Sequence, residues 1–336
     1  MPNRISCLVD TGLRMKQNNS ENNETYLYAK AKNQWFSLDF IIASVDAIVD
    51  TYLNEEKLHA WVIKYDFAER NGAKSIGIIM AGNIPLVGIH DFICAYLQGF
   101  NIQVKSSSKD EVLMHYFLQL LGEFDATLKE NMSIVQTLKN VDAVIATGND
   151  NSNRYFEYYF KSIPSILRKN RNSVALLNGA ESATQLEKLA DDIFMFFGLG
   201  CRNVSKLYVP RNYDLTILFP HFSKYEFLHQ HSKYMNNYDY NRTLLLMNGT
   251  PHLANDFCML KEDSSFASRI AEVHYQFYDN IEDLISDISS HQEQIQCVLA
   301  EFAIPTIQVL PFGSSQSPSL SDYADNVDTM AFLINL

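Results

Sequence analysis

The chain has 336 residues, of which 47% are hydrophobic, and its formal net charge is −12 at pH 7. This length suffices for about two domains of ~150 residues, each with a hydrophobic core of its own. The negative charge argues against nucleic acid as the main partner, because phosphate backbones are bound by clustered Lys and Arg. It leaves room for a local basic pocket that binds a nucleotide.

No segment reaches the ~18 uninterrupted apolar residues of a membrane span, since the nearest candidate, residues 36–49, contains Asp39 and Asp46. The polar N-terminus shows no secretory signal. The five cysteines, at positions 7, 94, 201, 258 and 297, include no CxxC pair, which argues against a disulfide framework and a zinc knuckle. We therefore expect a cytoplasmic protein without a bound metal.

Residues 1–33 form a polar segment, whose Asn-rich stretch 17–25 is expected to be a flexible loop. Residues 34–66 predict helices, because apolar residues recur at spacings of three and four. From residue 74 onward, short apolar strands alternate with helices, which is typical of a doubly wound parallel sheet that binds ligands beyond the carboxyl ends of its strands. The predicted strands are 75–80, 102–104, 143–146 and 174–177, and the predicted helices are 85–97, 110–121 and 153–160.

A second α/β unit follows. Ser182 and Gln185 form a capping box at the start of a helix that is expected to stop at Gly198. Further strands are predicted at 207–209, 215–219, 243–247, 270–275 and 296–299, with a helix at 281–290. Residues 311–336 form a tail.

Cys201 is the strongest candidate for a reactive residue. It follows the predicted helix and two glycines, Gly198 and Gly200, which allow a close approach of the backbone. The neighbouring cations Arg202 and Lys206 would lower the pKa of the thiol toward a reactive thiolate. Most cysteines are small buried hydrophobic residues, and the other four, which lack this setting, are interpreted in that way.

Loops at the predicted strand ends carry polar groups that suit a cofactor site. Asn83, after the first strand, could donate to a developing oxyanion, although asparagine at such a turn more often caps a helix. After the second strand, Lys105 and Lys109 flank three serines, 106–108. These side chains could hold a ribose and a phosphate, and they suit a solvated loop equally well.

After the third strand, Gly148 and Asn149 open a helix whose backbone N–H groups suit a pyrophosphate. Asp150 opposes an anion there, and an ordinary Asn-rich turn explains these residues equally well. The chain contains no GxGxxG fingerprint, no P-loop and no GxSxG elbow. The histidines are interpreted as core or surface residues, including the group at 221, 229 and 231.

The order of four motifs resembles the aldehyde dehydrogenase superfamily. They are Gly-Asn-Ile-Pro-Leu at 82–86, Lys-Ser-Ser at 105–107, Thr-Gly-Asn at 147–149 and Gly-Leu-Gly-Cys at 198–201. The chain is more closely similar to the LuxC-type long-chain acyl-CoA reductases, through residues 78–88 and 198–210 and through Asp-Tyr-Ala-Asp at 322–325. The likeness extends from around residue 34 to the C-terminus.

This resemblance implies an aldehyde-dehydrogenase-like α/β fold, with a Rossmann-like cofactor domain built on a parallel sheet and an α/β catalytic domain. We expect the polar segment at 1–33, a helical lead-in and the dinucleotide-binding domain at 34–181, and the catalytic domain at 182–310. The tail at 311–336 is expected to return to the cofactor domain. Family habit also implies a homo-oligomer.

The resemblance further implies that Cys201 is the acylated nucleophile, and that Asn83 and the Cys201 backbone N–H form the oxyanion hole. It implies that Lys105 and Ser107 face the adenosine ribose, and that Gly148 and Asn149 face the pyrophosphate. The full set of predicted cofactor-binding residues is Gly82, Lys105, Ser107, Ser108, Lys109, Gly148 and Asn149.

Two departures from the superfamily pattern narrow the chemistry. Acid-forming members carry Glu-Leu-Gly-Gly, whose Glu activates water, whereas residues 176–179 read Leu-Leu-Asn-Gly; this favours reduction of a thioester over its hydrolysis. Glu181 lies two residues on and is interpreted as a charge at a helix N-terminus. The Glu-x-Phe-Gly-Pro motif that grips the nicotinamide ribose is poorly matched by 262–268, so no residue is assigned there.

The cofactor is expected to be NADPH, because NAD-preferring members usually have Glu where this chain has Ser108, next to Lys109. The sequence thus favours a fatty acyl-CoA reductase that forms an aldehyde through an acyl-Cys201 thioester. One alternative is reduction of acyl groups delivered by a partner synthetase or acyl carrier protein. Another is a non-redox acyl-binding or acyltransfer module, which the weak nicotinamide-ribose motif supports.

Overall fold

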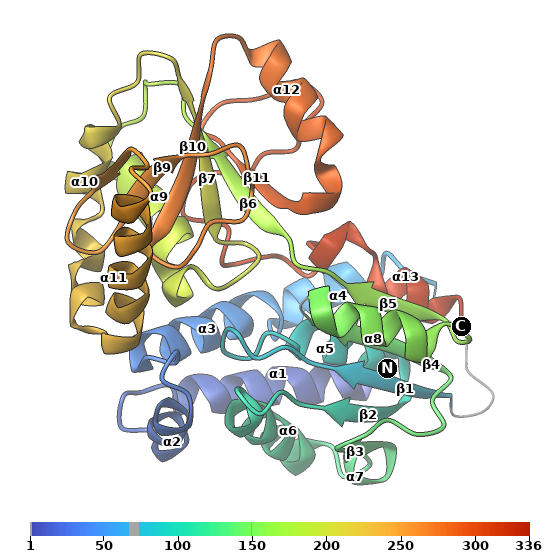
Figure 1. Ribbon diagram of the computed structural model, residues 1–336. Helices are drawn as coiled ribbons and strands as arrows, with labels where there is room; N and C mark the ends of the chain where they lie inside the picture. Colours follow the sequence, from blue (N-terminus) through green and yellow to red (C-terminus); the bar gives the residue numbers. More distant parts are fainter. Residues whose placement is uncertain (1, 67–73, 149) are drawn as a thin grey trace. The chain divides into compact units, whose positions relative to one another are not determined.

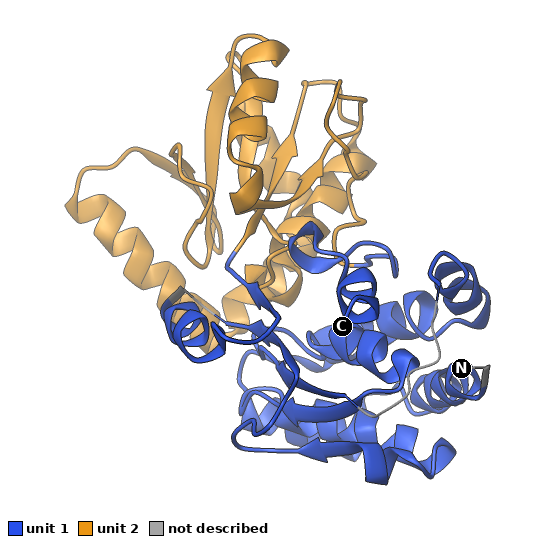
Figure 2. Ribbon diagram, turned by 90° about the vertical axis from the view of Figure 1, so that its right-hand side faces the viewer, with its two compact units in different colours: residues 1–170, 317–336 blue, residues 171–316 orange. Residues whose placement is uncertain are grey.

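The computed structural model describes residues 2–66, 74–148 and 150–336 (Figure 1). The chain forms two compact units (Figure 2). Unit 1 comprises residues 1–170 and 317–336, and unit 2 comprises residues 171–316. Each unit has a sheet of its own, and helices and parallel strands alternate in both.

Unit 1 begins with four helices, α1 (Pro2–Gln17), α2 (Glu24–Lys32), α3 (Leu38–Thr51) and α4 (Glu55–Val62). The last two confirm the helices predicted at 34–66, whereas α1 and α2 were not predicted. The polar composition of α1 hides an amphipathic pattern, because Ile5, Leu8 and Met15 are buried on one face. Within the Asn-rich stretch, the Asn23 side chain accepts hydrogen bonds from the next turn and caps α2.

The sheet of unit 1 has the order β3-β2-β1-β4-β5, and all its strands are parallel. This confirms the predicted fold class. The strands are β1 (Ser75–Ile79), β2 (Asn101–Lys105), β3 (Met132–Ile134), β4 (Ala143–Thr147) and β5 (Ser165–Arg168). The connecting helices are α5 (Ile89–Gln98), α6 (Glu111–Phe124), α7 (Leu128–Asn131) and α8 (Asp150–Phe160). β3 and β5 were not predicted because neither short strand is a continuous run of buried apolar residues.

The strand predicted at 174–177 is not part of this first sheet. It is β6 (Asn172–Leu176), which lies in the sheet of unit 2, where the order is β11-β6-β7-β10-β9-β8. The prediction was wrong because a buried parallel strand is an apolar run in either sheet. The other strands are β7 (Val204–Pro210), β8 (His252–Ala254), β9 (Met259–Glu262), β10 (Glu272–Tyr278) and β11 (Ile295–Leu299). The β8–β9 pair is antiparallel, and the other pairs in this sheet are parallel.

The main helices of unit 2 are α9 (Ala183–Phe194), α11 (Ser232–Met247) and α12 (Ile281–Ser290). The capping box of Ser182 and Gln185 is present at the start of α9. The strands predicted at 215–219 and 243–247 are wrong. The first is a 3₁₀ turn, Leu215–Ile217, followed by the short α10 (Leu218–His221), and the second is the last turn of α11. An apolar run of five residues fits a buried helix segment as well as a strand.

The C-terminal segment packs as part of unit 1 and contains α13 (Thr329–Ile334). The Arg168 guanidinium forms a two-pronged ion pair with Asp91 of α5, at 2.5 and 3.2 Å, and donates to Thr329 Oγ1 and to the Ala324 carbonyl. The Arg168 side chain is almost fully buried, and Arg168 and Asp91 satisfy each other's charge. Through its bonds to Ala324 and Thr329, Arg168 ties the end of β5 to the C-terminal segment.

The core of unit 1 lies between the sheet and the helices α1, α3, α5 and α6, and it extends to the buried side chains of α13. In unit 2, α12 covers β6, β7 and β11, with Tyr208 and Phe266 among the buried aromatic side chains. None of the described helices is long and apolar enough to span a membrane.

Candidate active site

A strained turn leads from α9 into the loop that carries Cys201. Three consecutive residues, Phe196, Phe197 and Gly198, have φ values of 54°, 59° and 71°. The left-handed region costs a non-glycine residue about 1–3 kcal/mol and persists only where the surroundings enforce it. Both phenylalanines are buried, and the ring of Phe197 lies 4.4 Å from that of His231. Packing therefore holds a backbone path that the sequence alone would not favour.

Cys201 is the second residue of a tight turn, because the Asn203 N–H donates to the Gly200 carbonyl at 3.1 Å. Two further hydrogen bonds fix the same turn. Asn203 Oδ1 accepts from the Gly200 N–H at 2.8 Å, and Ser173 Oγ on β6 donates to the Cys201 carbonyl at 3.0 Å. Cys201 is half-buried, whereas the other four cysteines are buried. Of the five cysteines, Cys201 is thus the one that is not buried, and hydrogen bonds fix its backbone.

Arg202 and Lys206, the two cations expected to lower the pKa of the Cys201 thiol, make contacts elsewhere. Arg202 Nη1 donates to Cys297 Sγ at 3.2 Å. The Lys206 ammonium is fully buried, donates to the Ser264 carbonyl at 2.6 Å and lies over the rings of Tyr208 and Phe266. The Lys206 ammonium therefore contacts the interior of unit 2. Its effect on the pKa of the Cys201 thiol stays a prediction.

In unit 1, the carboxyl ends of β1, β2 and β4 are level with one another. Ile79 pairs with Lys105 on one side and with Ala146 on the other. The loops that begin at Met80, Ser106 and Gly148 therefore start at the same edge of the sheet, where parallel sheets bind ligands. Three of the predicted cofactor segments are brought together in this way.

Gly82 and Ser107 are in direct contact within this edge. A Cβ added at Gly82 would lie 2.6 Å from Ser107 Oγ and 3.1 Å from the Asp110 backbone nitrogen. Ser107 Oγ also accepts from the Lys109 N–H at 3.3 Å, so it caps its own turn. Only glycine at position 82 lets the first loop pack so tightly on the second.

The remaining predicted residues are distributed around the same edge. Asn83, Lys105 and Gly148 are half-buried, and Ser108 and Lys109 are exposed. A Cβ at Gly148 would lie 2.8 Å from atoms of both Ser152 and Phe156, so the start of α8 is closely packed. Asn149 lies outside the described residues.

Asp110 is a residue of this edge that sequence reasoning missed. Its side chain is buried, and its Oδ2 accepts from the Leu86 N–H at 2.6 Å. Burial raises the pKa of this carboxyl well above its usual range. Asp110 thereby ties the Asn83 loop, where Leu86 has a φ of 57°, to the loop after β2. The only local signal was an aspartate before a helix, which normally indicates a cap.

Other polar groups singled out in the sequence have structural roles. Both carboxylate oxygens of Glu181 accept backbone N–H groups, from Asn178 at 2.7 Å and Gly179 at 3.1 Å. His231 Nδ1 accepts from the Tyr234 N–H and caps α11. Tyr323 of the Asp-Tyr-Ala-Asp run accepts from Trp61 Nε1 at 3.1 Å and anchors the C-terminal segment.

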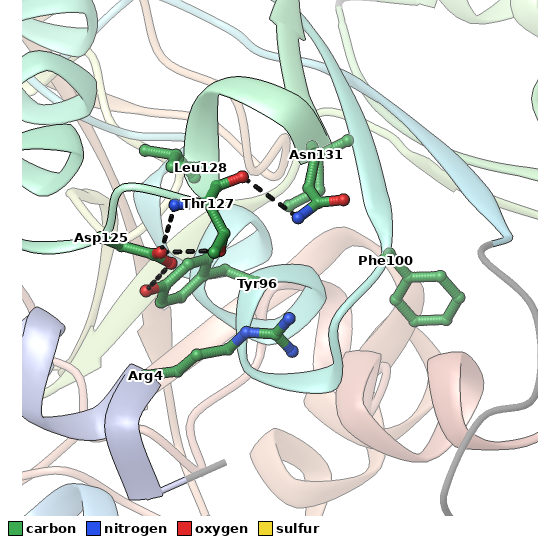
Figure 3. Close-up of a pocket in the computed structure, with 8 residues that line it drawn as sticks. Arg4, Tyr96, Phe100, Asp125, Thr127, Leu128 and Asn131 are labelled. Carbon is green, nitrogen blue, oxygen red and sulfur yellow. Dashed lines mark hydrogen bonds between the residues drawn. The ribbon is translucent and has the colours of Figure 1, made fainter.

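A small cavity of about 10 Å³ lies in unit 1, between the start of α1, α5 and α7 (Figure 3). Its lining includes Arg4, Tyr96, Asp125 and Asn131, and the Tyr96 hydroxyl donates to Asp125 Oδ2 at 2.8 Å. The volume suits about one water molecule, and none of the predicted cofactor residues lines it. Among the described residues, no three His, Cys, Asp or Glu side chains are grouped so that they could hold a metal ion.

Comparison with known proteins gives one family and one fold. Residues 16–218 match the family model described as acyl-CoA reductase (LuxC). Aldehyde dehydrogenase 21 from Physcomitrella patens, solved with succinate, has a TM-score of 0.70 at 11% identity, covering 99% of this chain and 83% of that one. The indole-3-acetaldehyde dehydrogenase AldA of P. syringae, solved with NAD⁺, has a TM-score of 0.65 at 14% identity, covering 89% and 72%.

A putative aldehyde dehydrogenase from Burkholderia cenocepacia has a TM-score of 0.64 at 13% identity, covering 85% of this chain and 72% of that chain. A search of the curated proteins found no match. At such identities the structural likeness establishes the aldehyde dehydrogenase fold.

Proposed function

Because this chain belongs to the LuxC acyl-CoA reductase family, we propose that it is a fatty acyl-CoA reductase that forms an aldehyde through Cys201. Membership of the family and the fold make it an oxidoreductase that acts on acyl or aldehyde groups. The observation that carries the finer proposal is the setting of Cys201. It is half-buried in a turn fixed by hydrogen bonds on both sides, whereas every other cysteine of the chain is buried.

In the proposed reaction, the Cys201 thiolate attacks the carbonyl carbon of the acyl thioester. A new carbon–sulfur bond forms, the bond to the CoA sulfur breaks, and CoA leaves as its thiolate. A bound nicotinamide cofactor would supply a hydride to the acyl carbon held on Cys201 Sγ. The resulting thiohemiacetal then collapses, returning the electron pair to Cys201 Sγ and releasing the aldehyde. Asn83 and the Cys201 N–H are the proposed donors to the oxyanion of each tetrahedral species.

Reduction is favoured over hydrolysis because the stretch that matches the Glu-Leu-Gly-Gly of acid-forming members has no carboxylate to activate water. Residues 176–179 contain no Asp or Glu. The next carboxylate in the sequence, Glu181, uses both oxygens to accept backbone N–H groups within its own turn. A general base must be within reach of the water that it deprotonates, and this one is engaged in holding the loop.

We infer that the residues at the strand ends of unit 1 bind the dinucleotide. Gly82 packs against the Ser107 side chain and near the Asp110 backbone nitrogen, which brings the loop after β1 close to the loop after β2 at this edge. Lys105 and Ser107 are half-buried there, and they are proposed to hold the adenosine ribose. The pyrophosphate is proposed to bind at Gly148 and Asn149, where α8 begins. Similar solved structures of two aldehyde dehydrogenases contain NAD⁺, which supports a nicotinamide cofactor here.

We propose that the cofactor is NADPH. Ser108 and Lys109 are exposed beside the proposed ribose site, so a 2′-phosphate would meet a serine and a cation where NAD-preferring members usually have a glutamate. Fluorescence titration with both reduced cofactors tests this, and tighter binding of NADH would exclude it. Replacing Lys109 by alanine is expected to weaken NADPH binding and leave NADH binding unchanged.

The experiment that tests the reaction is incubation with acyl-CoAs of graded chain length, followed by mass spectrometry and an assay of aldehyde formation. Cys201→Ala should abolish the acyl adduct and lower NADPH-dependent aldehyde formation more than about 1,000-fold, as loss of a covalent nucleophile does. Cys297→Ala is the matched control, because it removes the thiol that contacts Arg202 and leaves Cys201 in place. Aldehyde formation by the Cys201→Ala variant would contradict the mechanism.

A further inference from the structure

We propose that Asn203 is a positioning residue that aims the backbone N–H of Cys201 at the oxyanion of the reacting thioester. The inference rests on the proposed acylation of Cys201. Asn203 is buried at 3% exposure, so it acts through the backbone and not by touching the substrate.

The first observation is that Asn203 grips Gly200 at both of its backbone groups. Its side-chain oxygen accepts from the Gly200 N–H at 2.8 Å, and its own N–H donates to the Gly200 carbonyl at 3.1 Å. The Gly200 carbonyl and the Cys201 N–H belong to one planar trans peptide and point in opposite directions. The backbone bond to the carbonyl therefore fixes the direction of the Cys201 N–H, and the side-chain bond to the Gly200 N–H holds the preceding peptide, so that the turn keeps its shape.

The second observation is that Asn203 is itself anchored. Its side-chain nitrogen donates to the carbonyls of Asp192, Ile193 and Met195, at 3.1, 3.4 and 2.8 Å. These carbonyls lie at the end of α9, where the last turn of a helix has no partners of its own. The residues that follow adopt the left-handed path of the strained turn. The Asn203 side-chain amide thus joins the end of α9 to the loop that contains Cys201.

The third observation concerns the peptide on the other side of Cys201. Ser173 Oγ donates to the Cys201 carbonyl at 3.0 Å, and Ser173 is fully buried in β6. The peptide after Cys201 is therefore held by a side chain of β6, and the peptide before Cys201 is held by the backbone N–H of Asn203, which directly precedes β7. A donor fixed before the charge develops needs no reorganisation in the transition state, which is the main source of oxyanion stabilisation.

Two reactions of the same thiol separate positioning from general stability. Acylation by an acyl-CoA passes through an oxyanion, whereas alkylation by iodoacetamide displaces iodide from a saturated carbon and forms none. We would measure both rates at Cys201 by mass spectrometry in single-turnover mixtures, and take the ratio of acylation to alkylation. Asn203→Ala keeps the backbone N–H but removes the side-chain bond to Gly200 and the three bonds that anchor the turn to the end of α9. The ratio should then fall about 10- to 100-fold, as small displacements of catalytic groups lower a rate.

Asn241→Ala is the matched control. Asn241 is also a buried asparagine of unit 2, and its side chain donates to the Ile270 carbonyl at 3.0 Å. Its loss should lower stability and leave the ratio unchanged. Ser173→Ala removes the tether on the other peptide alone and should lower the ratio by a smaller factor; it carries the test if Asn203→Ala does not fold.

An unchanged ratio in folded Asn203→Ala, or in Ser173→Ala where Asn203→Ala does not fold, would overturn the inference while leaving the proposed function intact. A wild-type protein that is alkylated but never acylated at Cys201 would overturn the proposed function itself, and the inference with it. The two failures are thus distinguished within one set of measurements.

Discussion

Replacement of Lys206 by methionine tests how much the buried cation lowers the free energy of unfolding. The Lys206 side chain is fully buried, and its ammonium has one hydrogen-bond acceptor, the Ser264 carbonyl, together with the faces of Tyr208 and Phe266. Burial lowers the pKa of Lys206 from 10.5 to about 8, and two nearby carboxylates oppose this only in part. Methionine preserves a flexible unbranched chain without the charge.

The sign of the effect follows from proton binding. The folded protein releases the Lys206 proton near pH 8, whereas the unfolded chain keeps it until near pH 10.5. Between these values the unfolded chain binds more protons, so the free energy of unfolding of the wild type rises with pH. The difference between the two pKa values corresponds to about 3 kcal/mol. The methionine variant lacks this rise.

At pH 7 we expect the variant to be more stable than the wild type by about 2 kcal/mol, because loss of the Ser264 hydrogen bond offsets about 1 kcal/mol of the gain. Toward pH 10.5 the order should reverse. Urea unfolding of both proteins across this pH range measures the difference between their free energies of unfolding. The titration of tyrosines, cysteines and the other lysines is common to both proteins and cancels in this difference. A difference that is the same at every pH would refute the reasoning, because Lys206 would then have equal pKa values in both states.

Two further predictions concern unit 1. Gly82→Ala should weaken NADPH binding at least about 10-fold, because the new Cβ would overlap Ser107 and displace the loop. Gly122→Ala in α6 is the control, because the nearest atom to its new Cβ would be 3.9 Å away. It should leave NADPH binding unchanged and raise the free energy of unfolding by about 0.5–1 kcal/mol. Equal binding by both variants in fluorescence titration would contradict the packing argument. Arg168→Met should lower the free energy of unfolding by about 3–5 kcal/mol, because it leaves the Asp91 carboxylate buried without its partner. Chemical denaturation measures this loss, and the double variant with Asp91→Leu should recover much of it, whereas equal loss in both would show that the ion pair is not the cause.

The sequence predicts the fold well, because the fold depends on local patterns. The strands β1, β2 and β4 are continuous apolar runs, and α9 begins with a capping box. The setting of Cys201 is likewise written in its neighbours, with glycine on the N-terminal side and a strand after it. The roles of Cys201 and of the cofactor residues stay predictions until they are tested.

What the sequence did not reveal depends on contacts between distant residues. Asp110 looks like a helix cap, and its bond to the Leu86 N–H exists only once two loops meet at the sheet edge. Asn203 is one of many asparagines until the end of α9 is placed beside it. Lys206 appears in sequence as a cation near a thiol, yet its side chain enters the core. Secondary-structure propensity and the spacing of apolar residues do not determine which distant residue a polar side chain contacts.

The path of the chain through its two units has a consequence for biosynthesis. Unit 2 is continuous, whereas unit 1 is interrupted after Asn170 and resumes at Ser317. Arg168 emerges from the ribosome 161 residues before Thr329, one of its partners. At typical translation speeds this gap lasts roughly 10–30 s. During that time the nascent first half carries a guanidinium and a carboxylate in an unfinished pocket, while the inserted half can already fold, so chaperones have a defined interval in which to act.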